Sequence, residues 1–259
     1  MTTSTSSPKS LWRHLLPPAF WLGAWQFFAW IIDLSMNGKG NELLLPYPGS
    51  VALALLELGQ QSGFWMTVFS SLGRILAGMV LGCLLGVVLA ALTCLSSLAH
   101  DLLSPAIKVI RATPVASFAI LVLIWVNRDY VPVLICAMMG LPIVWNSVSS
   151  GIRMTDPQLL EMAKVYRLPK GRTLRRIWIP SVMPFFRTAC SSALGLGWKA
   201  GIAAEVLTVP KRSIGRMISE SKLYLLTEEL FASTLMVIVL SLLLQKLMLC
   251  LLRGRDAHA

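Results

Sequence analysis

The stretch LLEMAKVYRLPKGRTLRRIWIPSVMPFF, from Leu159 to Phe186, stands out in a chain of otherwise apolar segments. Between Arg153 and Arg176 there are seven lysine or arginine residues and only two acidic residues, Asp156 and Glu161. Hydrophobic residues make up 56% of the 259 residues and charged residues only 14%, whereas soluble domains carry about 25% charged residues. The composition therefore predicts an integral membrane protein that keeps one basic segment near its middle.

The first half of this segment has the pattern of a short amphipathic helix. Asp156 is a favourable N-cap residue, and Pro157 suits the first helical position because no backbone N–H is needed there. One apolar face follows at helical spacing, formed by Leu159, Met162, Ala163 and Tyr166. Glu161 and Lys164 lie on the opposite face. An ordinary basic loop that only fixes membrane orientation would explain the charge, but not the capped helix.

The second half predicts a turn and another short helix. Leu168 precedes Pro169 and is biased away from helical geometry, so the first helix is expected to end about there. Residues 170–171 form the turn, and a second helix runs from Arg172 to Ile179. We expect Pro180 to end that second helix. Its apolar side is formed by Leu174, Ile177 and Trp178.

The rest of the chain divides into apolar spans close to the bilayer-crossing length of about 20 residues. We expect an all-α membrane protein with six spans: Pro18–Leu34, Leu72–Leu92, Val115–Val126, Val131–Ser150, Pro184–Glu205 and Leu230–Leu251. The third span is short unless it begins near Ser104. The first lacks the small-residue cleavage pattern of a signal peptide, so it is expected to remain as a helix. Residues 18–251 then form one transmembrane domain between the tails 1–17 and 252–259.

The distribution of lysine and arginine predicts the orientation of the spans. A net charge of +11 also fits a nucleic-acid-binding protein, but in a membrane chain basic residues mark the cytoplasmic side. With both termini inside, the cytoplasmic segments hold thirteen lysine and arginine residues and the outer segments six. Loop 151–183 is then cytoplasmic and loop 206–229 is outside. The outer loop has a short amphipathic pattern, with one face formed by Ile214, Met217, Ile218 and Ser221.

Two rows of small residues recur every four positions within the spans. The second span carries Gly78, Gly82 and Gly86, and the fifth carries Ala189, Ala193, Gly197 and Gly201, with Glu205 continuing the row. Small residues let helices approach closely in lipid, so close packing is the favoured interpretation of both rows. The alternative is that the row of the fifth span lines a path for a solute.

Two cationic residues within the predicted spans have two possible interpretations. Lys199 lies beyond the middle of its span, and Arg74 lies near the outer end of another. Ionisable residues at such depth either line a pathway or extend to the membrane surface. Surface extension is favoured for Arg74, the choice stays open for Lys199, and Glu205 is expected beside Lys199 in a polar cluster. The candidate residues of a translocation path are Arg74, Gly197, Trp198, Lys199, Gly201 and Glu205.

The basic segment resembles the cytoplasmic motif of membrane permeases of ATP-binding-cassette (ABC) importers. That motif reads E-A-A, three residues, G, nine residues, I-x-L-P. Here Glu161-Met162-Ala163 is followed at the same spacing by Arg167 and then by Ile177-Trp178-Ile179-Pro180. A glycine at the position of Arg167 suits a left-handed helix cap. With arginine there, the sequence favours Pro169 as the end of the helix.

Further stretches are similar to the branch of these permeases that handles nitrate, sulfonates and taurine. They are LPYPGS (Leu45–Ser50), SLGRILAG (Ser71–Gly78), RATP (Arg111–Pro114) and WKAGIAAEVL (Trp198–Leu207). The resemblance covers residues from about 41 to 251 and implies a type I importer permease in a bacterial inner membrane. Its substrate would be a small and mostly anionic solute, bicarbonate included, although neutral vitamin precursors also occur among such relatives.

The resemblance also implies partners and a role for the motif. These would be two cytoplasmic ATPase subunits, an external substrate-binding protein and a second permease copy, with ATP bound by the ATPase. The chain has no G-x-x-x-x-G-K-[ST] phosphate loop, so neither a cofactor nor enzymatic activity of its own is expected. The residues assigned to ATPase coupling are Glu161, Met162, Ala163, Lys164, Tyr166, Arg167, Pro169, Gly171, Ile177 and Pro180.

Two other classes of membrane protein fit the sequence less well. An intramembrane hydrolase would need a nucleophile or metal set, yet the chain has neither H-E-x-x-H nor G-x-S-x-G, and its five cysteines lack metal-binding spacing. An ion-coupled secondary carrier usually places acidic residues or broken helices near the midplane of both halves. We find no such repeat and no central acid, but neighbouring reading frames for an ATPase and a binding protein would be the direct discriminator.

Overall fold

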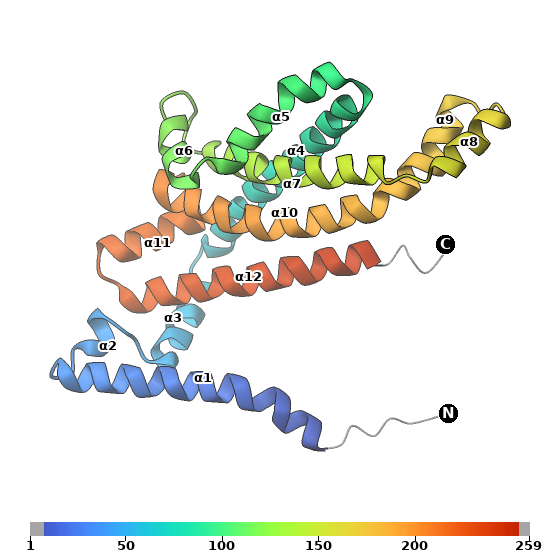
Figure 1. Ribbon diagram of the computed structural model, residues 1–259. Helices are drawn as coiled ribbons and strands as arrows, with labels where there is room; N and C mark the ends of the chain where they lie inside the picture. Colours follow the sequence, from blue (N-terminus) through green and yellow to red (C-terminus); the bar gives the residue numbers. More distant parts are fainter. Residues whose placement is uncertain (1–7, 254–259) are drawn as a thin grey trace. The chain divides into compact units, whose positions relative to one another are not determined.

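The computed structural model describes residues 8–253, and every regular element in this range is helical. This agrees with the all-α prediction. The chain divides into two compact units. Unit 1 contains the residues up to Trp65 together with Met217–Val237, and unit 2 contains Met66–Arg216 together with the residues from Ile238 onward (Figure 1).

Unit 1 is organised around the corner after its first helix. It contains α1 (Pro8–Ser35), α2 (Gly40–Leu43), α3 (Pro48–Gln60) and the beginning of α12 (Thr227–Arg253). The Asp33 carboxylate accepts hydrogen bonds from the Asn41 N–H at 3.1 Å and from the Tyr47 hydroxyl at 3.0 Å. Loss of solvent contact, the hydrogen bond to Asp33 and the charge of Asp33 raise the pKa of the Tyr47 phenol. These contacts fix the LPYPGS segment, whose Pro48 begins α3.

Unit 2 is built on three long helices, α4 (Phe64–Leu95), α7 (Val131–Arg153) and α10 (Ile179–Thr208). Gly78, Gly82 and Gly86 of α4 face α7. A Cβ atom on Gly78 would lie 2.7 Å from Cys136 Cβ, and one on Gly86 would lie 2.8 Å from Val144 Cβ. Because no side chain fits in these positions, the row allows close packing of the two helices, as the sequence predicts.

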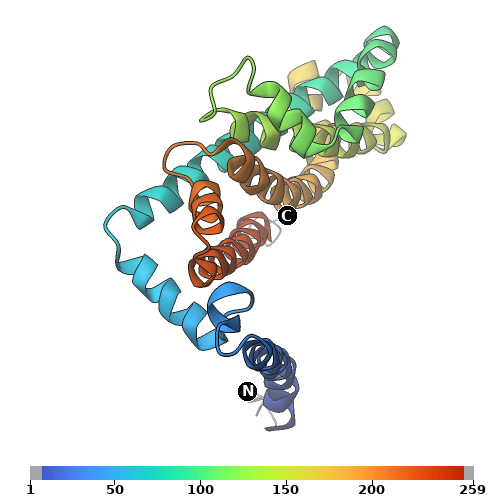
Figure 2. The same cartoon turned by 90° about the vertical axis from the view of Figure 1, so that its left-hand side faces the viewer.

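α7 and α10 make the most extensive helix–helix contact in unit 2, and the C-terminal part of α12 joins the same core. Leu244 and Met248 pack against a buried cluster that includes Val144 of α7 and Ala189 and Ala193 of α10. Figure 2 looks nearly along α10 and α12. This core uses small side chains where the helices meet and larger ones around them.

The third predicted span is a broken pair of helices rather than one helix. α5 (Ser97–Ala112) and α6 (Val115–Val122) meet at an angle of 104°. Thr113, which precedes Pro114, is extended, as expected for a residue before proline. α6 packs through Ala119 and Val122 on Val131 and Ala204. Pro114 therefore divides the segment, whereas Pro105 lies within α5.

Length and hydropathy identify four helices of the described residues as candidate membrane spans, or five with the bent pair. These four, Leu15–Ser35, Phe64–Leu95, Val131–Arg153 and Thr227–Met248, correspond to the first, second, fourth and sixth predicted spans. α10 has the length but is not among them. Twelve of its thirty residues are buried, among them Ala193 and Ala204, and it carries three charged residues, Arg187, Lys199 and Glu205, which lower its hydropathy.

The basic segment forms α8 (Pro157–Val165), α9 (Lys170–Thr173) and a π-helical turn η1 (Leu174–Trp178) that runs directly into α10. The prediction that Pro180 ends a second short helix is wrong. Pro180 lies in the first turn of α10, where its missing N–H is tolerated, and the Ile179 N–H bonds to the Leu174 carbonyl in the wider π-helical pattern. Gly171 is likewise part of α9 and not of a separate turn.

Candidate functional site

α8 begins as the sequence predicts. Asp156 occupies the N-cap, and its carboxylate accepts a hydrogen bond from the Gln158 N–H at 2.8 Å. Pro157 follows at the first helical position. The N-cap therefore satisfies one of the N–H groups that a helix leaves unpaired at its start.

The other end of α8 differs from the prediction. Arg167 has a φ of 48°, which is the left-handed conformation. The Arg167 N–H bonds to the Lys164 carbonyl at 3.0 Å, and the Leu168 N–H bonds to the Ala163 carbonyl at 2.9 Å. These two bonds form a complete Schellman cap. Arg167 thus adopts the backbone of the motif glycine, and Pro169 comes after the helix has already ended.

The apolar face of α8 is largely uncovered. Ala163 is only 5% exposed, whereas Met162 is 43% and Tyr166 74% exposed. Val165, which the predicted face did not include, is 79% exposed. Several exposed apolar side chains on one short helix are typical of a surface that meets another molecule. α8 thus rests on the chain through Ala163 and presents the rest of its apolar face outward.

The charged side chains of the basic segment are also exposed. Its seven cations and Glu161 are exposed, and none of them has an ion-pair partner among the residues whose side chains the structure describes, 15–248 and 250. Ile177 of η1 is buried at 5% exposure, while Pro180 is exposed. Ile177 therefore belongs to the part of the motif that anchors the segment to the helices, and Glu161 and Lys164 belong to the part that faces outward.

The opposite end of α10 holds a buried polar cluster that we call the Glu205 clamp. It consists of Ser71, Arg74, Glu205 and Gly215. The fully buried Glu205 carboxylate accepts hydrogen bonds from Ser71 Oγ at 2.7 Å, Arg74 Nε at 3.3 Å and the Gly215 N–H at 3.2 Å. Ser71 Oγ accepts in turn from the Ile214 N–H at 2.8 Å. The clamp joins α4 and α10 to the first residues of α11 (Ile214–Leu223).

The clamp also holds the loop between α10 and α11. The Arg74 guanidinium donates to the carbonyls of Lys211 at 3.2 Å and Arg212 at 2.7 Å, and Asp129 Oδ1 accepts from the Lys211 N–H at 2.9 Å. Val209 and Arg212 in this loop have left-handed φ values of 47° and 48°. Such conformations are costly for non-glycine residues and persist where surrounding contacts determine the backbone.

Gly215 is required at its place in the clamp. A Cβ atom there would overlap Glu205 Cβ and the backbone between Glu205 and Val206. α11 itself agrees with the amphipathic helix expected in loop 206–229, since Ile214 and Ser221 are buried and Met217 and Ile218 are half-buried. Its cations Arg216 and Lys222 are exposed.

Arg74 is 16% exposed and pairs with Glu205, a contact that the sequence does not predict. One prediction about the charged residues of the spans is wrong. Lys199 is exposed and does not join Glu205 in a cluster. The reason is geometric: Ser71 and Arg74 lie one turn apart on α4 and approach Glu205 from a neighbouring helix, whereas Lys199 points to another side of α10.

The residues expected along a translocation path fall into two groups, those buried between helices and those that are not. Trp198 is 2% exposed and Gly201 is buried, and a Cβ atom on Gly201 would lie 2.6 Å from Cys136 Sγ. Both residues therefore serve packing. Nothing lies within 4 Å of a Cβ atom on Gly197. The uncovered side of α10 is a different stripe, formed by Pro184, Thr188, Ser192, Leu196, Lys199, Ala203 and Leu207.

Comparison with known proteins assigns this chain to a protein family. Residues 78–254 match the family described as binding-protein-dependent transport system inner membrane component, which is more than half of the chain. The chain belongs to this family. It is an ABC-type permease subunit of a multi-pass inner-membrane transport system, and the family relationship agrees with a non-catalytic role.

Relatives of this permease include transporters of small anions and sulfonates. It is 24% identical to the taurine transport system permease protein TauC of Escherichia coli. The aligned region covers 79% of this chain and 76% of TauC. It is 27% identical to the bicarbonate transport system permease protein CmpB of Synechococcus elongatus. The aligned region covers 78% of this chain and 77% of CmpB. A chain in the crystal structure of an amino acid ABC transporter with histidines shares the fold with a TM-score of 0.56 and 19% identity, over 71% of this chain and 90% of that one.

Sequence reasoning about this permease missed the composition of the clamp. Ser71 and Arg74 were both within SLGRILAG, but neither was assigned to Glu205. The spacing of three residues, which puts a hydroxyl and a guanidinium on one helix face, was the available signal. Finding the partner 131 residues away from Arg74 required the three-dimensional fold.

Proposed function

We propose that this chain is the membrane-spanning subunit of an ATP-driven importer and that α8 docks on a separate ATPase subunit. The observation that carries the proposal is α8 itself, a capped helix at the motif position whose apolar face and charges are left uncovered. Glu161, Met162, Lys164, Tyr166 and Arg167 would meet the partner. The buried Ala163 and Ile177 would anchor the segment to the helices, so that closure of two ATPases moves the bundle. ATP is bound by the partner, and the permease needs no cofactor.

We further propose that both termini and the α8 end are cytoplasmic. Family membership and the excess of basic residues at this end support the orientation. The α11 end would then face the external substrate-binding protein, and two permease copies would enclose the path. Single cysteines at the exposed positions Lys222 and Lys164 provide the test. An impermeant thiol reagent added from outside should label Lys222→Cys and leave Lys164→Cys unlabelled; the reverse pattern would reject the orientation.

The ATPase contact is tested by charge reversal. In the assembled transporter, Glu161→Arg is expected to abolish substrate-stimulated ATP hydrolysis and transport without preventing membrane insertion, because Glu161 is exposed and bonds to nothing in the described chain. Asp101→Arg, also exposed but on α5, is the matched control and should keep most of the stimulated hydrolysis. Normal stimulation in Glu161→Arg would rule out α8 as the docking element.

For the substrate, we propose a small anion such as a sulfonate, taurine, nitrate or bicarbonate. The support comes from the relatives and from the uncovered stripe of α10, where Thr188, Ser192 and Lys199 are exposed. A lipid-facing helix surface would be apolar, and polar side chains at membrane depth usually face a cavity or another helix. We therefore propose this stripe as the path, in place of the row through Ala189 and Gly201.

Lys199 would give that path its positive charge. Lys199→Gln is expected to lower the transport rate more than the apparent affinity, because the binding protein supplies most of the affinity. Lys199→Arg keeps the charge but changes its shape and hydration, so it should recover part of the rate. Uptake into vesicles that contain the whole assembly measures both variants. A wild-type rate in Lys199→Gln would assign Lys199 to the membrane surface.

A further inference from the structure

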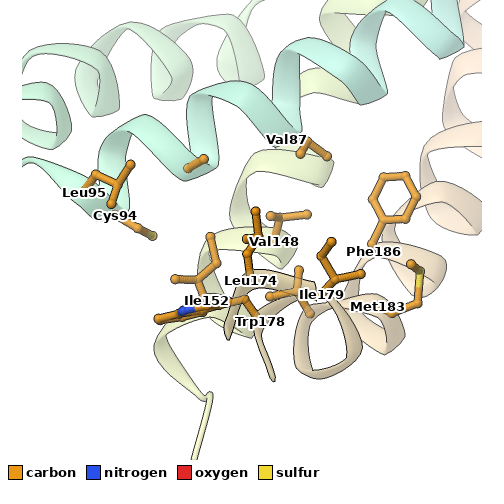
Figure 3. A pocket seen from close by; sticks show the side chains of 12 residues that line it. Val87, Cys94, Leu95, Val148, Ile152, Leu174, Trp178, Ile179, Met183 and Phe186 are labelled. Carbon is orange, nitrogen blue, oxygen red and sulfur yellow. The ribbon is translucent and has the colours of Figure 1, made fainter. Parts of the chain in front are cut away.

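An apolar cavity of about 600 Å³ lies at the α8 end of unit 2. Figure 3 shows side chains from α4, α7, η1 and α10 around it, including Val87, Val148, Trp178 and Phe186. Of the twelve lining residues, Trp178 alone has a side-chain nitrogen, and none has a side-chain oxygen. The volume is within the range of ligand pockets, about 300–1,000 Å³.

This lining does not suit a small anion. An anion in the cavity would lose its hydration and find almost no hydrogen-bond donors, which is strongly unfavourable. The cavity is thus distinct from the proposed path along Thr188, Ser192 and Lys199.

Three exposed arginines lie next in the chain to residues that line the cavity, or in the same helical turn. Leu174 and Ile179 line the cavity and are 54% and 45% exposed. Arg175 and Arg176 belong to the same π-helical turn as Leu174, and Arg153 directly follows the lining residue Ile152. All three arginines are exposed, and none has an ion-pair partner in the part of the chain that the structure describes. An apolar volume beside several unpaired cations has the complementarity of an amphiphile with a negative head.

We propose that this cavity binds one anionic phospholipid of the surrounding bilayer. An acyl chain would occupy the space between Val87, Ala91 and Phe186, and the headgroup phosphate would lie at Arg153, Arg175 and Arg176. Lipid tails are as apolar as leucine, so the tail gains little hydrophobic free energy when it leaves the bilayer. Selectivity must therefore come from the headgroup, where arginines form charge-assisted bonds to phosphate oxygens.

The location of the site suggests what the lipid would do. η1 supplies one wall of the cavity and continues without interruption into α9 on one side and α10 on the other. A bound lipid would fix the position of η1 against α4 and α7. The binding inference rests on the membrane placement of the chain and not on its ATPase partner, so the proposed docking of α8 and the lipid site can fail independently.

The experiment is lipid retention by the purified full-length permease. The protein is reconstituted with equal amounts of phosphatidylglycerol and phosphatidylcholine, and the lipids that stay bound are counted by native mass spectrometry. The expected result is one retained phosphatidylglycerol. Ala91→Trp should fill the cavity and abolish retention, whereas Leu92→Trp, on the neighbouring and 47% exposed position, should not.

The headgroup contribution has its own matched pair. The double variant Arg175→Gln/Arg176→Gln should lower the preference for phosphatidylglycerol over phosphatidylcholine by about tenfold, because each basic residue near an anionic headgroup contributes severalfold. Lys211→Gln/Arg212→Gln removes two exposed cations at the α11 end and should leave the preference unchanged. Equal retention of the two lipids by the wild type, persistence of the bound lipid in Ala91→Trp, or a cavity covered by a second permease copy that excludes lipid would each overturn the proposal.

Discussion

The two ends of α10 treat charged groups in opposite ways. At its C-terminal end, the Glu205 carboxylate is fully buried and accepts three hydrogen bonds from Ser71, Arg74 and the Gly215 backbone. At its N-terminal end, the cations of the basic segment are exposed without ion-pair partners among residues 15–248 and 250. The charges of the C-terminal end are paired within the chain itself, whereas those of the N-terminal end are left exposed.

This difference has a consequence for stability. Removing one member of a buried ion pair leaves the other without compensation, and that is more costly than the pair is favourable. Exposed charges and exposed apolar side chains, by contrast, contribute little to the stability of the isolated chain. Substitutions at the Glu205 clamp should therefore act on folding, and substitutions on α8 should act on assembly.

The largest expected effect is that of Glu205→Ala. It would leave the Arg74 guanidinium, the Ser71 hydroxyl and the Gly215 N–H without their shared acceptor, at a cost of about 3–5 kcal/mol. Unfolding of the purified permease in increasing denaturant measures it. Glu161→Ala removes the same side chain at the exposed end and should change stability by less than about 0.5 kcal/mol. Equal losses in the two variants would break the comparison.

A smaller effect is expected for Gly215→Ala. The added methyl group overlaps Glu205 and the adjoining backbone, and overpacking of this kind costs about 1–3 kcal/mol. Gly197→Ala is the matched control, because nothing lies within 4 Å of its new Cβ atom. The same unfolding measurement applies. If Gly215→Ala is as stable as Gly197→Ala, α11 does not begin against Glu205 and the clamp has another geometry.

The sequence predicted the α8 end better than the α11 end because its signals are local. Asp156 as N-cap depends only on the residues that immediately follow it, and the motif spacing from Glu161 to Pro180 can be read directly from the chain. The row of glycines on α4 also predicts close helix packing from a local signal, the spacing of four residues. The clamp depends on which helices become neighbours, so Arg74 was assigned to the membrane surface and Glu205 to Lys199.

Local reasoning also failed where two backbone preferences compete. Pro180 can end a helix or begin one, and the residues before it form a π-helical turn that keeps the chain helical into α10. On intrinsic preference alone, the sequence favours Pro169 over a left-handed Arg167 as the end of α8. In the structure, the two Schellman hydrogen bonds and the extended segment toward Pro169 outweigh that preference.

The smallest expected effect concerns Arg167 and sharpens the description of the α8 end. Its left-handed backbone costs a residue with a Cβ atom about 1–2 kcal/mol. Arg167→Gly removes that cost, but it adds freedom to the unfolded chain, worth about 0.4–1 kcal/mol, and deletes a cation near the helix C-terminus. The net change should lie within about 1 kcal/mol of the wild type.

Arg167→Ala separates these contributions, because it also deletes the cation but retains a Cβ atom in the left-handed conformation. Arg167→Gly should therefore hold the cap more firmly than Arg167→Ala by about 1 kcal/mol. Hydrogen exchange of the Leu168 amide, whose N–H bonds to the Ala163 carbonyl, measures the cap without unfolding the bundle. Slower exchange in Arg167→Gly than in Arg167→Ala is the expected order. Slower exchange in Arg167→Ala would mean that α8 ends without a left-handed residue.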